Sequence, residues 1–207
     1  MGTTRRPAAW RLLVVAAVVT AGCAPPESVR EPVASGLELQ RPFEPGGQVQ
    51  IVLSAGKYTI AGSPEKQISL VAETGNPADR RKVHLSASID GREAVIRTEG
   101  PSNRFAVTIG LPSRSDLIVR LSAGDLTISG LEGHKDVSAW AGDVKIGVAR
   151  AEDQRSVNAS VLAGEISARP FDRSTGGVFR FLSWQGGGQY DLRVRLTAGQ
   201  VTLRIDK

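Results

Sequence analysis

Apolar and polar residues alternate along most of this chain, and five times the alternation passes through one short motif. The motif is apolar, any residue, Ala, Gly, any residue, apolar, any residue, apolar, and its copies occupy residues 53–60, 121–128, 139–146, 161–168 and 196–203. Alternation with a period of two places successive side chains on opposite faces of a β-strand. Each copy therefore predicts a strand, a tight turn and a second strand.

The Ala-Gly pair lies at the turn of every copy, and its glycines are Gly56, Gly124, Gly142, Gly164 and Gly199. We expect these glycines to adopt a positive φ, which a Cβ atom would penalise. The alanine before each glycine is expected to be crowded by its equivalents in the neighbouring copies.

The spacing of the repeat glycines predicts a stacked architecture. Successive glycines are separated by 68, 18, 22 and 35 residues, and the two short gaps match one coil of a solenoid. A single coil cannot bury its apolar side, whereas stacked coils share ladder hydrogen bonds and one core. We therefore predict an all-β fold, a right-handed parallel β-helix or solenoid-like domain of stacked short strands. On this reading the 68-residue gap holds about three degenerate coils. The alternative is an antiparallel β-sandwich whose hairpins all use Ala-Gly turns.

The first 22 residues have the pattern of an export signal. Arg5, Arg6 and Arg11 form a positive region, residues 12–21 are mostly apolar, and small residues precede Cys23. An apolar segment of this length is too short for a transmembrane helix, which needs about 20 residues. We predict a lipoprotein signal peptide at 1–22, a Pro-rich tether at 23–47 and the β-solenoid domain at 48–207.

Cys23 is the single cysteine of the chain. Its position directly after Ala21-Gly22 resembles the lipobox of bacterial lipoproteins, which implies lipidation of Cys23 and a membrane anchor at that residue. The alternative is ordinary cleavage after Ala21, which would leave an unpaired thiol in an oxidising compartment. The resemblance implies a lipid-anchored protein of the cell envelope, in the outer membrane or periplasm if the host is Gram-negative.

The charge of the chain argues against nucleic acid as a partner. The formal net charge is +5, and removal of residues 1–22 takes away three arginines and no acidic residue, which leaves +2. The remaining basic residues are spread along the strands, whereas a nucleic-acid site needs a concentrated basic stripe.

The repeats resemble those of the bacterial putative-adhesin repeat proteins, in which Ser-Gly-Asp or Ala-Gly-Asp turns recur between valine-rich strands. The matching segments are residues 121–128, 141–144 and 187–201, and the resemblance extends from about Val49 to Ile205. It implies an exported β-solenoid-like domain at the cell envelope, of unknown function and without established catalysis.

The residue after the repeat glycine is acidic in three copies, at Asp125, Asp143 and Glu165. Stacked in one column, these carboxylates could hold Ca²⁺ through oxygen ligands. They are also polar residues that favour turns, and one column offers few ligands. The residues therefore predict no metal site beyond this candidate column, no cofactor and no catalytic group.

Trp140 fills an outward position that Ser54, Ser122 and Thr197 fill in other copies. An exposed Trp on a polar face can stack on a sugar ring or anchor a protein interface. The alternative is burial beneath the Pro-rich segment or a loop. Together with Thr127 and Lys145, Trp140 forms our candidate binding face.

The sequence thus predicts a non-enzymatic, lipid-anchored envelope protein whose solenoid surface binds or braces another envelope component, an unidentified protein or glycan. Two alternatives remain open: a glycan-binding or glycan-acting β-helix, and a regulatory lipoprotein of an envelope stress-sensing complex. Exposed coil edges are templates for strand addition, so edge-to-edge association of two copies is also possible.

Overall fold

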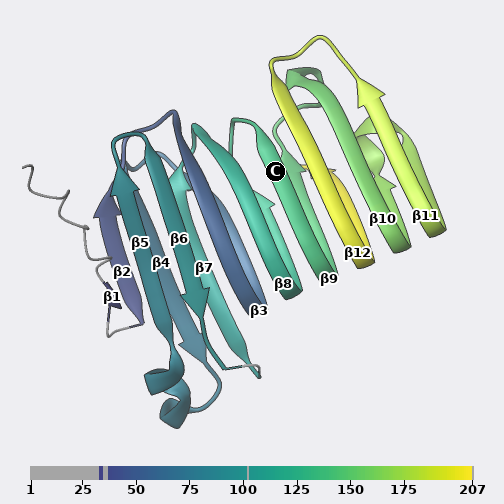
Figure 1. Ribbon diagram of the computed structural model, residues 1–207. Coiled ribbons are helices and arrows are strands. Elements are labelled where there is room, and N and C mark those ends of the chain that lie inside the picture. The colour runs from purple at the N-terminus through teal and green to yellow at the C-terminus, as the bar shows by residue number, and fades with distance from the viewer. Residues whose placement is uncertain (1–32, 35–36, 102, 207) are drawn as a thin grey trace, which may run out of the picture. The chain divides into compact units, whose positions relative to one another are not determined.

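The computed structural model describes residues 33–34, 37–101 and 103–206, so that the predicted signal peptide and Cys23 lie outside the described residues. This part of the chain is all-β, as predicted, and its strands form one 12-stranded sheet (Figure 1). The strands are β1 (Val33–Ala34), β2 (Glu38–Pro42), β3 (Gly47–Ser63), β4 (Gln67–Thr74), β5 (His84–Asp90), β6 (Glu93–Glu99), β7 (Phe105–Pro112), β8 (Ser115–Ser129), β9 (Lys135–Val148), β10 (Gln154–Ala168), β11 (Arg173–Gln185) and β12 (Tyr190–Ile205). Short 3-10 helices follow β4, β9 and β10, at η1 (Pro77–Lys82), η2 (Ala151–Asp153) and η3 (Arg169–Phe171). None of the helices in the described ranges has the length and apolarity needed to cross a membrane.

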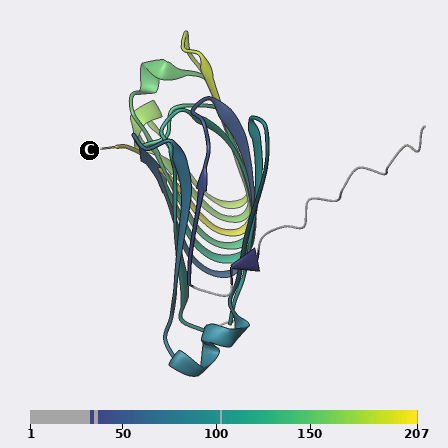
Figure 2. The same cartoon turned by 90° about the vertical axis from the view of Figure 1, so that its left-hand side faces the viewer.

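The five Ala-Gly motifs lie in five long strands that are bent at the motif and stacked in parallel. Glycine lies opposite glycine between β3 and β8, between β12 and β9, and between β10 and β12. Figure 2 shows the bent strands stacked one behind another, with two arms on either side of the bend. The predicted strand, turn and strand are therefore one continuous strand per coil, and the parallel stacking is confirmed.

Apolar side chains on the inner sides of the two arms form the core. In the arm before the bend, Ile51, Val119 and Val137 occupy equivalent positions on β3, β8 and β9, and all three are fully buried. The column continues through Val194 and Ala159 on β12 and β10. Because the column continues from coil to coil, neighbouring coils bury each other's apolar side chains, which a single coil could not do.

Close contact between coils explains the repeat glycines. A Cβ atom on Gly142 would lie 1.9 Å from the carbonyl oxygen of Gly124, and φ of Gly142 is +126°. The same positive φ and the same clash of a Cβ atom with the carbonyl oxygen of the neighbouring repeat glycine are found at Gly124, Gly164 and Gly199. At Gly56, by contrast, φ is not positive and a Cβ atom would meet Phe105 atoms at 3.0–3.1 Å. The prediction of a positive φ is thus confirmed for four glycines and wrong for Gly56, because no Ala-Gly coil stacks on the far side of β3.

The coils do not all stack in chain order, contrary to our expectation. Strand β12 lies between β9 and β10, and β11 runs antiparallel to β10 at the end of the sheet. The inner side of β12 is apolar, with Leu192, Val194 and Leu196 buried, whereas Leu182 is the one buried residue of β11. The more apolar strand therefore takes the interior position and the more polar one the edge.

The 68-residue gap between the first two motifs does not hold three degenerate coils. Strands β6 and β7 pair in parallel with the two arms of β3 and form one coil, interrupted between residues 100 and 104. Strands β5 and β4 then extend the arms antiparallel to β6 and β7. The N-terminal third therefore has the antiparallel pairing of the alternative prediction, while the remainder is solenoid-like.

The folded domain begins before residue 48, where we predicted the end of the tether. Strand β2 pairs antiparallel with β4, and Leu39 and Phe43 are buried in the core. Pro42 is the last residue of β2, an edge strand, where a missing N–H group costs no ladder hydrogen bond. Because the segment is rich in proline, its sequence predicts a tether where this short strand lies.

Candidate functional site

A groove of about 700 Å³ crosses the outer face of the arms that precede the bends, from β3 to β11. We call it the Trp140 groove. Small hydroxyl side chains (Ser122, Ser138, Ser160 and Thr197) line it, together with larger apolar and basic ones (Trp140, Leu162, Phe179, Arg120, Arg180 and Arg195). The ladder places all of these residues except Arg180 in two rows, two and four residues before the repeat glycines, whereas Arg180 lies opposite Val161, three residues before Gly164.

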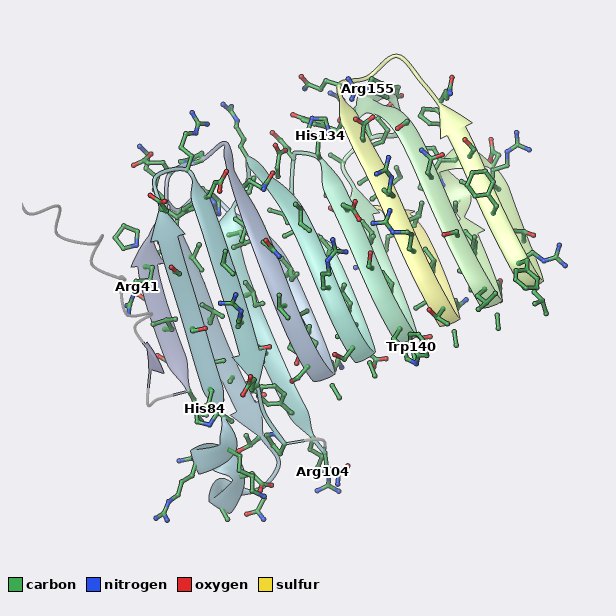
Figure 3. All side chains as sticks on the ribbon, in the orientation of Figure 1. Arg41, His84, Arg104, His134, Trp140 and Arg155 are labelled. Atoms are coloured by element: carbon green, nitrogen blue, oxygen red, sulfur yellow. The ribbon has the colours of Figure 1, made fainter. Side chains whose placement is uncertain are left out.

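Trp140 projects from β9 at the bend side of this face (Figure 3), and 70% of its surface is exposed. Its neighbours in the same row are Ser122 on β8 and Thr197 on β12, as the register of the flanking residues shows. Neither side chain is large enough to cover the indole ring. Within the described residues Trp140 is therefore available for contact, and the alternative of burial beneath a loop is not realised there.

Two arginines flank Trp140 on the adjacent strands. The Arg120 Nη1 atom donates to Ser138 Oγ at 3.2 Å, and Arg195 Nη2 donates to Asp136 Oδ1 at 2.7 Å. Arg195 Nε also approaches Ser138 Oγ, at 3.4 Å. These contacts hold both guanidinium groups over β9, the strand that carries Trp140. The site therefore combines one aromatic ring with two guanidinium groups, each of which offers several N–H donors.

Apolar exposure increases toward the C-terminal end of the groove. Leu162 on β10 is 44% exposed, and Phe179 and Phe181 on β11 are 79% and 65% exposed. Our sequence reasoning missed these three residues. Leu162 could have been found, because it fills the same position before Ala-Gly that drew attention to Trp140.

Thr127 and Lys145 do not share a face with Trp140. They lie opposite each other on β8 and β9, three residues after the repeat glycines, and so belong to the arm beyond the bend. Trp140 precedes its glycine by two residues and belongs to the other arm. The candidate binding face is therefore divided between two sides of the domain, because alternation along a sequence does not reveal on which side of a bend a residue lies.

The three acidic residues of the candidate calcium column are not consecutive in the stack. Gln200 lies opposite both Asp143 and Glu165, because β12 lies between β9 and β10. Only Asp125 and Asp143 are on adjacent coils, and no group of three or more potential metal-ligating side chains is present among the described residues. The stacking order thus separates the carboxylates that the calcium hypothesis brought together.

At the other end of the same face, a cleft of about 330 Å³ is bordered by charged residues. Asp191 accepts hydrogen bonds from Arg155 Nε at 3.0 Å and from Ser156 Oγ at 2.8 Å, and its backbone N–H donates to His134 Nδ1 at 3.1 Å. The Arg155 guanidinium, followed by the Ser156 hydroxyl, lowers the pKa of Asp191 to about 2. Figure 3 shows His134 and Arg155 near each other at this end. Asp191 joins Arg155, Ser156 and His134 in one set of mutual contacts, so we assign this cluster to structure.

Lys135 is the one basic side chain in the described residues that is buried in the core. Its Nζ atom donates to the carbonyl oxygens of Leu131 at 2.8 Å and Gly133 at 3.2 Å. Burial lowers the pKa of Lys135 to about 8, against the opposing attraction of Asp206 and Asp116. The ammonium group stabilises the connection between β8 and β9 through these hydrogen bonds and faces away from the Trp140 groove.

The fold and the groove define an all-β, solenoid-like domain with a surface suited to binding. No protein-family model matches the chain, and no curated protein sequence matches it. Among solved structures, the chain is similar to a putative cell adhesion protein from Clostridium sporogenes. The two are 15% identical, with a TM-score of 0.47, and the match covers 80% of this chain and 97% of that one.

Proposed function

We propose that this chain is a non-enzymatic, lipid-anchored protein of the cell envelope that binds another envelope component in the Trp140 groove. The observation that carries the proposal is the exposed indole of Trp140 between Arg120 and Arg195 in a groove of about 700 Å³. Tryptophan and arginine are the residue types that most often dominate binding energy at interfaces. Large apolar side chains gathered on one part of a soluble surface also mark interaction sites.

The shape of the groove favours an elongated ligand. The groove crosses several stacked strands, and neighbouring strands lie about 4.8 Å apart. Trp140 and Phe179 are separated by β12 and β10, so three such steps place them about 14 Å from each other along the stack. A linear chain that contacts both residues would therefore lie across the strands, over the hydroxyl groups of Ser138 and Ser160.

A glycan is the second candidate ligand, and the composition of the groove favours it. Aromatic rings stack on the apolar faces of sugars, while serine, threonine and arginine side chains offer hydrogen bonds to hydroxyl and acidic groups. The same residues suit an extended peptide, whose carbonyl groups accept from arginine. The experiment must therefore distinguish a protein ligand from a polysaccharide.

Photo-crosslinking tests the proposal in the native host. A photoreactive residue replaces Trp140 in one variant and Thr127 in a control, because Thr127 lies on the opposite arm. Proteolysis and mass spectrometry then identify the adducts. We expect adducts at position 140 and few at position 127. A protein adduct identifies the partner complex, including any stress-sensing complex, and an adduct carrying sugar mass identifies a glycan.

Binding measured with Trp140→Ala provides the quantitative test. Loss of a central aromatic anchor typically costs about 2 kcal/mol, so we expect affinity for the identified partner to fall about 30-fold. Val71→Ala, a truncation of an exposed residue on β4, is the matched control and should leave affinity unchanged. Equal adduct yields at positions 140 and 127, or unchanged binding by Trp140→Ala, would refute the groove as the binding site.

A further inference from the structure

Strand β11 is a free sheet edge of 13 residues. It is the last strand of the sheet and pairs only with β10 among the described strands, and nothing lies beyond it in Figure 1. Twelve of its 13 residues are exposed or half-buried, including Val178, Phe179 and Phe181. A row of unpaired N–H and C=O groups beside exposed apolar side chains is a template for another strand.

Two common protections of a sheet edge, lysine and proline, are absent from β11. Proteins block such edges with lysine, proline or a covering loop. Residues 173–185 contain no lysine and no proline, and their charged side chains are Arg173 and Arg180. The opposite end of the domain differs, because its arms finish in separate antiparallel strands, β1 beside β5 and β2 beside β4.

The bend of β11 restricts what can pair with the whole edge. Gly177 lies opposite Gly164, so β11 follows the same bend as the stacked coils. A straight strand from another protein could pair with one arm only. A strand that bends at the same position can pair with both arms, and β11 of a second copy is such a strand.

We propose that two copies of this chain pair through β11, antiparallel and about a twofold axis between Gly177 and Val178. This register places bend on bend and sets Arg180 of one copy opposite Thr175 of the other, two residues that lie opposite the buried Val161 and Ile166 of β10. It also places Phe181 opposite Ser174, both on the outward face, and Leu182 opposite Arg173, so that no two arginines face each other. An isologous pair of this kind closes on itself and produces a dimer rather than a fibre.

The size of the interface predicts a reversible dimer. Pairing of residues 173–182 in both copies would form about eight backbone hydrogen bonds, close to the ten of a typical interface. The two phenylalanines, at 79% and 65% exposure, offer roughly 290 Å² if each ring carries about 200 Å². A standard interface buries about 800 Å² per partner, so the hydrogen bonds supply much of the affinity.

Dimerisation would also complete one end of the Trp140 groove. Phe179 and Arg180 line the groove at its β11 end. In the dimer, Gly176 and Thr175 of the second copy lie opposite them. The interface thus goes beyond the proposed function, and it is independent of Trp140, which lies three strands away on β9.

Disulfide trapping in the full chain tests this register. Ser174→Cys with Phe181→Cys brings two cysteines opposite each other across the axis, at a Cα separation of about 4.5–5.5 Å that a disulfide spans. Ser174→Cys with Phe179→Cys is the control, because its cysteines are diagonal neighbours about 7–8 Å apart. The unchanged chain controls for Cys23. We expect a covalent dimer from the first pair at least tenfold more abundant than from the second.

Sedimentation of the chain over a concentration series provides the second measurement. We expect a reversible dimer that Val178→Lys weakens at least tenfold, because a charge then enters the paired edge. Val71→Lys, an equal change on β4, should leave association unchanged, and circular dichroism checks that both variants fold. A chain that remains monomeric at every concentration, or equal trapping by the two cysteine pairs, would overturn the proposal. Loss of dimer with ligand binding retained would leave the proposed function intact.

Discussion

Replacement of Gly142 by alanine tests the physical basis of the coil stack. Gly142 has a φ of +126°, a conformation that side chains with a Cβ rarely adopt. The new Cβ would lie 1.9 Å from the carbonyl oxygen of Gly124 and 2.7 Å from its carbonyl carbon. Both obstacles are backbone atoms, so a rotamer change cannot relieve them.

The cost follows from the displacement that the methyl group requires. Separation to 3.0 Å, the shortest distance that Cβ atoms normally show, moves the two coils apart by about 1.1 Å. A ladder hydrogen bond of about 2.9 Å would then exceed 3.5 Å and be lost. Two lost bonds at about 1 kcal/mol each, with about 1–3 kcal/mol of backbone strain, predict a loss of about 3–5 kcal/mol in the free energy of unfolding.

Gly56→Ala is the matched control in the same column. Its φ is not positive, and its Cβ would meet Phe105 and Tyr58 atoms at 3.0–3.3 Å, which small shifts relieve. We expect a change within about 1 kcal/mol, partly offset by the reduced entropy of the unfolded chain. Urea denaturation followed by circular dichroism measures both variants. Equal losses for Gly142→Ala and Gly56→Ala would refute the explanation of the repeat by close coil contact.

Two further predictions concern titratable groups. Because the pKa of Lys135 is lowered from 10.5 to about 8 on folding, the unfolded chain binds more protons between these values, and stability should rise as pH increases from about 8 to 10.5. The rise amounts to about 3 kcal/mol and should be absent from Lys135→Met, as urea denaturation at several pH values will reveal. Arg155→Ala should raise the pKa of Asp191 from its lowered value, because the guanidinium is the first cause of that shift, and carboxyl titration by NMR measures it. An unchanged pKa of Asp191 would assign the shift to Ser156 instead.

The regular part of the fold could be predicted because each coil repeats one local requirement. The repeat specifies apolar residues inside, alanine before the bend and glycine at it, and the register confirms this for the five motifs. The order of the coils could not be predicted, because β10 and β12 carry the same motif and each satisfies the same ladder. The order of β10 and β12 is decided by β11, which pairs with β10. Arg180 on the inner side of β11 lies opposite Val161 and makes β11 unsuitable for the interior of the stack, so β10 lies next to the edge.

The strands around β3 in the N-terminal half, β2 and β4 to β7, were predicted less well, because they lack the motif. The coil formed by β6 and β7 is interrupted between residues 100 and 104, so no Ala-Gly pair marks its bend. Strand β2 lies among prolines, and Leu39 and Phe43 alone reveal its burial. Alternation of apolar residues was present in these strands, but direction and partner depend on contacts between distant segments.

The outward-facing row of residues two positions before the repeat glycines shows which side chains the fold does not determine. Ser54 and Ser122 occupy this row on β3 and β8, so a polar residue satisfies the coil. Trp140, Leu162 and Phe179 occupy it on β9, β10 and β11, where their exposed apolar surface reduces solubility and adds little to the core. Folding therefore does not require these three residues, and their exposure supports the proposed contacts with a ligand and with a second copy. The same reasoning explains why the row is polar near the N-terminal end of the stack and apolar beside the free edge of β11.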